Sequence, residues 1–134
     1  MEKFSTKFKS SKQPKKQRTY WHNAPLHIKQ KFVHAHLSKE LRAKYNKRSF
    51  GLKKGDTVKI LRGQFKGKSG KVDRIDLKKG KAVITGIEVT KKDGSKTFYP
   101  IYVSNLMITE LSLDDKQRKI KLEVENEQKT PKKA

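Results

Sequence analysis

The chain has 134 residues and carries 35 Lys and Arg against 13 Asp and Glu, a formal charge of +22. A compact fold with this much positive charge repels itself unless a polyanion neutralises it, so nucleic acid is the leading partner. There is no cysteine, which excludes disulfides and thiolate metal sites. No apolar run approaches the roughly 20 residues of a membrane span, and the basic N-terminus lacks the apolar segment of a secretory signal. We therefore expect no membrane partner.

Positive charge is concentrated in residues 1–50, where only Glu2 and Glu40 are acidic. The first twenty residues are polar and basic, and we expect them to order only on a partner. Two short helices are predicted behind them. NAPLHIKQKFVHAHL has Asn23 as a cap and Pro25 in its first turn, and SKELRAKYN has Ser38 as its N-cap. Neither helix is long enough to be stable alone.

From Gly51 onward, the sequence changes to short apolar runs separated by turns. Five runs predict strands: TVKIL, GKVDRIDL, AVITGIEV, TFYPIYV and NLMITEL. The alternation slips once in GKVDRIDL, which predicts a bulge, and Pro100 predicts an edge or a break. The third run is expected to place on one face Val83, Thr85, Ile87 and Val89. Five short strands with basic turns indicate a mainly β protein built as a small, strongly bent barrel.

The chain is therefore divided into three parts. Residues 1–50 form a basic N-terminal extension with two short helices, and residues 51–111 form the barrel. Residues 112–134 form a C-terminal helix, predicted from LDDKQRKIKLEVE, and a tail.

The stretch GQFKGKS resembles a nucleotide-binding phosphate loop, which requires four residues between its glycines and a following helix. Here only three residues separate Gly63 from Gly67, and Gly70 is followed by a predicted strand. A small NTPase is therefore rejected. The glycines instead allow positive φ or close backbone approach at sharp turns, and Asp56 is expected to bond turn amides. The predicted structural turn residues are Gly55, Asp56, Gly63, Gly67 and Gly70.

The stretch KKGDTVKILRGQFKGKSGKVDRID resembles the KOW motif, G-D-x-V, then a G-x-x-K-G loop, then G-x-V. The matching residues are Gly55, Asp56, Val58, Gly63, Lys66, Gly67, Gly70 and Val72. Outside this motif, SSKQPKKQR, NAPLHIKQK and LSKELRAKYNKRSF resemble the front of one family. It is the universal large-subunit ribosomal protein numbered twenty-four (twenty-six in the eukaryotic scheme), in its archaeal and eukaryotic form. The resemblance runs from about Ser10 to Leu122.

This resemblance implies a five-stranded SH3-like barrel, the KOW domain, in a non-enzymatic constituent of the large ribosomal subunit. It also implies binding to the 5′ region of large-subunit rRNA, early action in subunit assembly, and a position near the peptide exit tunnel. The partners would be this rRNA and neighbouring ribosomal proteins, with a cytoplasmic, ribosome-bound location and no cofactor or small-molecule substrate. The acidic LEVENEQ near the C-terminus favours an archaeal protein. The alternative is a KOW-type transcription elongation module.

Three groups of residues are candidates for RNA contact. Cations and planar side chains at the front suit phosphates and unpaired bases, although Tyr20 and Trp21 could instead pack on the barrel. Cations on or beside the short helices suit a phosphate groove, and the lysine-rich loop faces RNA in the family. The predicted RNA-binding residues are Lys12, Lys15, Lys16, Arg18, Tyr20, Trp21, His22, Lys29, Lys31, Lys47, Arg48, Arg62, Lys66, Lys68 and Lys71.

Neither catalysis nor metal binding is expected. The clustered carboxylates Asp56, Asp73 and Asp76 have no nucleophile and base beside them. His34 and His36 make a poor metal pair if they lie on a helix, because positions i and i+2 do not face each other. The remaining aromatic candidates, Tyr99 and Tyr102, are expected to pack on the barrel rather than to hold bases.

Overall fold

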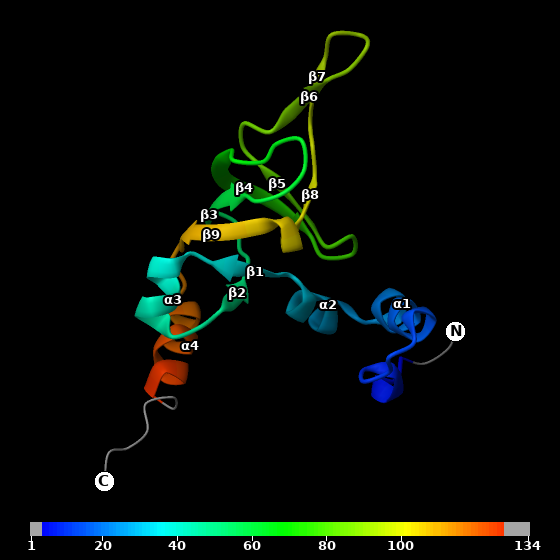
Figure 1. The fold of residues 1–134 in the computed structure, drawn as a ribbon, viewed down its shortest axis with the longest axis vertical. Coiled ribbons are helices and arrows are strands. Elements are labelled where there is room, and N and C mark those ends of the chain that lie inside the picture. The colour runs from blue at the N-terminus through cyan, green and yellow to red at the C-terminus, as the bar shows by residue number, and fades with distance from the viewer. Residues whose placement is uncertain (1–3, 128–134) are drawn as a thin grey trace.

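A β-sheet lies at the centre of the computed structural model, which describes residues 4–127 (Figure 1). The strands are β1 His34–Leu37, β2 Ser49–Gly51, β3 Thr57–Ile60, β4 Ser69–Asp76, β5 Lys81–Ile84, β6 Glu88–Thr90, β7 Lys96–Phe98, β8 Ile101–Tyr102 and β9 Leu106–Glu110. The α-helices are α1 Pro14–Asn23, α2 Leu26–Phe32, α3 Lys39–Tyr45 and α4 Lys116–Glu127. Two 3₁₀ turns are η1 Thr6–Phe8 and η2 Val103–Asn105. No helix in the described part is long and apolar enough to cross a membrane.

Seven strands pair in the order β2-β1-β9-β3-β4-β5-β8, and β6 and β7 form a separate hairpin that projects from the sheet (Figure 1). The expectation of a mainly β protein is therefore confirmed. The five predicted runs all contain strands. Within residues 4–127 the strand order has two ends, β2 and β8, and no pairing between them closes a barrel.

Strand β3 supplies the middle of the core because its apolar residues alternate. Val58 and Ile60 point inward and are almost fully buried, while Lys59 between them is exposed. β3 pairs antiparallel with β4 on one side and with β9 on the other. Leu106 and Ile108 of β9 are fully buried beside them. This alternation is readable in the sequence, and the strand lies where it predicts.

The bulge predicted in GKVDRIDL is present. The register of β4 against β5 shifts between Val72 and Arg74. Close to it, the two strands approach so tightly at Gly70 that an added Cβ would lie 2.6 Å from the carbonyl oxygen of Thr85. Only glycine fits there, because a Cβ atom cannot approach backbone that closely.

The single strand predicted for AVITGIEV is wrong. The chain turns at Gly86, where φ is +84°, and divides into β5 and β6. As a result Thr85 is exposed, whereas Ile84 and Ile87 are both buried, so the predicted alternation does not hold across the turn. The turn sends β6 and β7 away from the sheet as a projecting hairpin (Figure 1).

The sheet begins before Gly51, the residue at which strands were expected to start. The first predicted helix ends at Phe32, and the chain then forms β1, which pairs antiparallel with β2 and parallel with β9. Ala35 and Leu37 of β1 are buried in the core. Strand and helix are hard to distinguish in VHAHL because short apolar runs of this kind occur in both.

Helices occupy both ends of the chain. α1 begins at Pro14, within the segment expected to order only on a partner, and the Gln17 side-chain amide donates to the carbonyls of Phe8 and Ser11. α3 begins after Ser38, whose hydroxyl accepts from the Leu41 amide as predicted. The front helices α1 and α2 lie at the lower right of the view and α4 at the lower left, both below the sheet (Figure 1). The predicted tail beyond Glu127 lies outside the described residues.

Candidate nucleic-acid interface

The front cations lie on or just before α1 and face solvent. Lys12, Lys15 and Arg18 are exposed, and α1 itself contains no Asp or Glu that could neutralise them. Lys16 is half-buried, with its ammonium 5.5 Å from the centre of the Phe8 ring. Four cations at these positions form a charged segment that suits a phosphate backbone.

Tyr20 is not available for base stacking. It is only 8% exposed, and its ring lies 5.3 Å from the Phe4 ring and 5.9 Å from the Phe32 ring. These three aromatic residues form a small core that holds the front helices together. The prediction that Tyr20 contacts RNA is therefore corrected to a packing role, because its ring is enclosed by its own chain.

Trp21 and His22 remain accessible. Trp21 is partly exposed, the Lys29 ammonium lies 5.6 Å from its ring centre, and the ring edge packs against Gly80 in the β4–β5 turn. His22 is exposed, with Nδ1 3.1 Å from the side-chain oxygen of Asn23. Trp21 thus connects the front helices to the sheet, and one face of its ring is already occupied by a cation.

On α2, Lys29 is half-buried beside the tryptophan ring and Lys31 is exposed.

The next two candidates, Lys47 and Arg48, are neighbours with opposite environments. Arg48 is exposed, whereas Lys47 is 7% exposed, donates from Nζ to the Lys121 carbonyl at 2.8 Å, and lies over the Phe50 ring. The prediction of an RNA contact by Lys47 is therefore wrong: its ammonium is used to fix α4 to the sheet.

The loop between β3 and β4 presents the third group. Gly63 and Gly67 take φ values of +95° and +88°, as expected for sharp turns, and nothing lies within 4 Å of where a Cβ would stand. Their role is therefore conformational rather than steric. The exposed cations in and just after this loop are Arg62, Lys66, Lys68 and Lys71.

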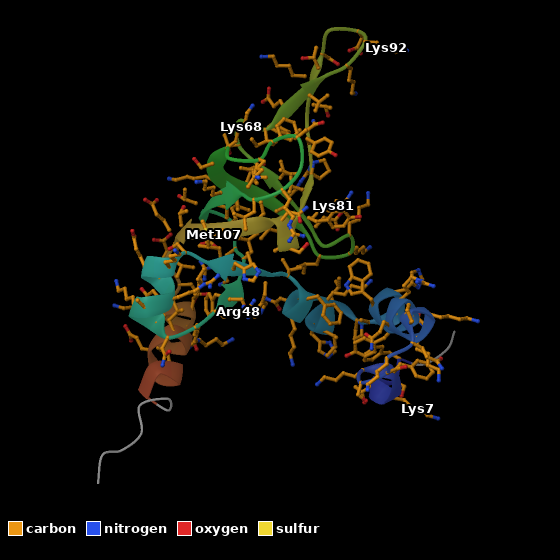
Figure 2. The ribbon with its side chains drawn as sticks, viewed as in Figure 1. Lys7, Arg48, Lys68, Lys81, Lys92 and Met107 are labelled. Carbon is orange, nitrogen blue, oxygen red and sulfur yellow. The ribbon has the colours of Figure 1, made fainter. Side chains whose placement is uncertain are left out.

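An aromatic residue anchors this loop. Phe65 is half-buried against the core, and its ring lies 5.3 Å from the Tyr99 ring. The Lys68 ammonium lies 5.4 Å from the Phe65 ring centre. The loop therefore keeps a fixed apolar base and turns its charged side chains outward; Lys68 is labelled in Figure 2.

The turn before β3 contains a buried ion pair. Asp56 accepts the amides of Lys53 and Ser112, at 2.9 and 3.0 Å, so it bonds turn amides as predicted. Its two carboxylate oxygens also accept from the two terminal nitrogens of Arg118, at 2.6 and 2.7 Å. Arg118 lies on α4, 4% exposed, and also donates to the carbonyls of Ser112 and Gly51. We call this arrangement the Asp56–Arg118 clamp.

Two exposed pairs lie near the clamp. Lys53 bonds Asp115, and this hydrogen bond is the main reason why the pKa of the Asp115 carboxyl is lowered. Lys54 lies 3.7 Å from Asp73. These lysines are thus partly neutralised by the chain's own acids.

Comparison with known proteins adds the decisive observation. Residues 11–125 match the family described as the eukaryotic ribosomal proteins L26 and their archaeal form, number twenty-four. The chain belongs to this family. Its relatives include proteins called large ribosomal subunit protein uL24. Those of Methanosphaera stadtmanae and Methanothrix thermoacetophila are 47% and 51% identical over 108 residues, which cover 81% of this chain and 92% and 93% of theirs. That of Methanoculleus marisnigri is 50% identical over 112 residues, 84% of this chain and 93% of its own.

Membership confirms the family that the sequence resembles, and the relatives agree with its archaeal form. It also agrees with the prediction that the chain is not an enzyme, since this is a family of ribosomal proteins. The matched region includes the front helices, the loop between β3 and β4, and the clamp.

Most of the predicted RNA-binding cations have no acidic partner among the described residues. Lys47 is used inside the fold, and the ion pairs found within residues 4–127 use other cations, namely Lys53, Lys54 and Arg118. A charge left without a partner in the folded chain remains available for a polyanion.

One cationic surface was missed by sequence reasoning. A groove runs between α2, the sheet and α4, and several of its lining residues are cationic or ionisable: His27, Lys31, Lys53, Lys54 and Lys121. Of all its lining cations, only Lys31 and the buried Lys47 were predicted as RNA-binding residues. The others come from segments far apart in the sequence, so no local pattern indicates the groove.

The histidines also lie differently from the expectation. His34 and His36 are on β1 rather than a helix, where positions i and i+2 share a face. The spacing objection to a metal pair therefore fails. Even so, the described residues contain no group of three or more His, Cys, Asp or Glu side chains arranged to hold a metal.

Proposed function

We propose that this chain is a structural constituent of the large ribosomal subunit that binds the 5′ region of large-subunit rRNA. Its family and the names of its relatives support a role in that subunit. The observation that carries the RNA assignment is the set of exposed cations that have no acidic partner among the described residues. We further propose that it acts early in assembly, with neighbouring ribosomal proteins, near the peptide exit tunnel in the cytoplasm.

The proposed platform is an SH3-like barrel of the KOW type. The strand order β9-β3-β4-β5-β8 supports it, because η2 leads directly from β8 back into β9. The end of this five-strand series is thus joined by a short corner to its beginning. The motif residues Gly55, Gly63 and Gly67 have the positive φ that such sharp turns require.

The proposed mechanism is electrostatic. Each cation that meets a phosphate releases a condensed counterion, and fixed elements hold neighbouring RNA segments in register. The front segment and the hairpin extend away from the sheet, so the chain can contact RNA segments that lie far apart. Lys7 lies in the front segment and Lys92 at the hairpin tip (Figure 2). Ordering these segments lowers the entropic cost of later assembly steps.

The test is the affinity of the full chain for a 5′-region large-subunit RNA fragment, measured by filter binding between 50 mM and 400 mM salt. The logarithm of the affinity should fall linearly with the logarithm of salt, by about 0.7 to 0.9 per phosphate contact. A flat plot would contradict the proposal. Deleting residues 1–22 should weaken binding while the sheet still folds, as judged by circular dichroism.

The alternative, a transcription elongation module, predicts that the chain associates with a different complex in the cell. A chain that works in the ribosome co-sediments with the large subunit when a cell lysate is spun through a sucrose gradient. A transcription elongation module would instead follow RNA polymerase. Crosslinking on the assembled subunit would then identify the nucleotides touched by Lys66 and Lys68.

A further inference from the structure

Tyr99 is an exposed aromatic residue whose ring is supported by a second ring. It was expected to pack on the barrel, and one side of it does contact Phe65, yet the side chain is 45% exposed. Among the described residues, Trp21 and Tyr102 each carry a lysine ammonium over the ring, at 5.6 and 4.6 Å, whereas no cation lies over Tyr99. Its ring is therefore held on one side and open on the other.

The loop that supports Tyr99 is positively charged. Phe65 fixes its position from the loop between β3 and β4, and this loop also carries three exposed cations, Arg62, Lys66 and Lys68. The Lys68 ammonium lies over the Phe65 ring itself, 5.4 Å from the centre. The open ring thus contacts the residue over which Lys68 lies, in a loop whose cations form no ion pair among the described residues.

We propose that Tyr99, supported by Phe65, stacks an unpaired RNA base while the cations of the adjacent loop hold the phosphates on either side of it. This inference rests on the proposed RNA-binding function and adds a site to it. Unpaired bases stack on aromatic rings whatever their sequence, and cations beside the ring neutralise the linking phosphates. An apolar protein partner is disfavoured because the loop that supports the ring carries three exposed cations, which such a partner would have to desolvate.

The neighbouring residue provides a matched control. Phe98 is 48% exposed, almost the same as Tyr99, but it lies directly opposite the acid Glu88 in the β6–β7 hairpin. Successive side chains of an extended chain point to opposite sides, so Phe98 points away from the Phe65 contact. A carboxylate beside the ring repels phosphates. Phe98 therefore has a comparable exposed aromatic surface, but it faces a carboxylate and shares its strand face with one lysine, Lys96, rather than being held by a loop with three cations.

The experiment compares the full chain with Tyr99→Leu, Tyr99→Phe and Phe98→Leu. The probes are an RNA hairpin with an unpaired loop and a blunt RNA duplex of equal charge. Tyr99→Leu should weaken binding to the hairpin by about five- to hundredfold and leave the duplex unchanged. Tyr99→Phe should keep the wild-type affinity because it keeps the ring, and Phe98→Leu should have no effect. The log–log salt slope should not change in Tyr99→Leu, because a neutral ring releases no counterion.

Three results would overturn the proposal: an unchanged hairpin affinity in Tyr99→Leu, an equal loss on the duplex, or an equal loss in Phe98→Leu. Thermal unfolding followed by circular dichroism shows whether each variant keeps the fold. A wild-type chain that bound neither probe would instead remove the proposed function itself. The two failures are therefore distinguishable in one data set.

Discussion

The Asp56–Arg118 clamp and the loop between β3 and β4 place cationic side chains in opposite environments. In the Asp56–Arg118 clamp, the guanidinium is buried and its terminal nitrogens donate to the Asp56 carboxylate and to two backbone carbonyls. In the loop between β3 and β4, Lys66 and Lys68 are exposed and pair with no acid of the described chain. The same kind of side chain thus stabilises the fold in one region and remains available to a polyanion in the other.

The comparison teaches how to assign a role to a cation in a very basic protein. The type of residue does not decide it, because the chain carries 35 Lys and Arg. What decides it is whether the fold already supplies the counter-charge. The clamp joins the turn before β3 to α4, so its contribution should be measured in unfolding. The contribution of the loop cations should instead appear in the affinity for RNA.

The largest expected effect comes from breaking the clamp. Arg118→Met leaves the Asp56 carboxylate buried with only amide partners, so the free energy of unfolding should fall by about 3–5 kcal/mol in urea titrations. The control is Lys119→Met, an exposed lysine on the same helix, which should change stability by less than about 0.5 kcal/mol. Equal stabilities of the two variants would show that the clamp does not hold α4.

The second prediction concerns the loop. Lys66→Ala with Lys68→Ala should reduce the log–log salt slope of RNA binding by about 2 and lower affinity roughly ten- to hundredfold near 0.1 M salt. Unfolding should be almost unchanged, because both lysines are exposed. Lys91→Ala with Lys92→Ala removes the same charge from the hairpin tip. If this control lowers the slope equally, net charge rather than the loop determines binding.

The adjacent residues Lys47 and Arg48 sharpen the comparison at one place in the chain. Lys47→Met removes a charged hydrogen bond to the Lys121 carbonyl and should cost about 1.5–3 kcal/mol of stability without changing the salt slope. Arg48→Met should do the reverse, reducing the slope by about 1 at nearly constant stability. Urea titration and filter binding on both variants check this. If both variants lost stability, or if both reduced the salt slope, the separate roles given to Lys47 and Arg48 would be contradicted.

The smallest effect is expected at the exposed pair Lys53 and Asp115. The hydrogen bond from Lys53 lowers the pKa of Asp115, so the pair's contribution is present above the unfolded-state pKa and is lost as pH falls through the lower folded value. The Asp115→Asn variant should therefore be slightly less stable than wild type at neutral pH, and the two should be equally stable in strong acid. Urea midpoints measured across this pH range check it. A difference that persisted in acid would show that charge is not the cause.

The sequence by itself determined much of the local structure. The alternation in TVKIL, the slip in GKVDRIDL and the Ser38 cap each appear where predicted. The glycines at 55, 63 and 67 take positive φ, and Gly70 lies where strands approach closely. These features depend on residues a few positions apart, so short-range sequence patterns contain them. The family was also identifiable, because its motif and front segments are contiguous.

Only the tertiary structure decided which side chains are used inside the fold. Asp56 meets Arg118 and Lys47 meets the Lys121 carbonyl, and in each pair the partners are more than sixty residues apart. Tyr20 is enclosed although it lies in polar sequence, while Tyr99 stays open although it lies in the apolar run TFYPIYV. Burial and counter-charge depend on which distant segments pack together. Local sequence patterns do not contain that packing, so sequence alone could not show which candidate residues of the proposed interface are exposed.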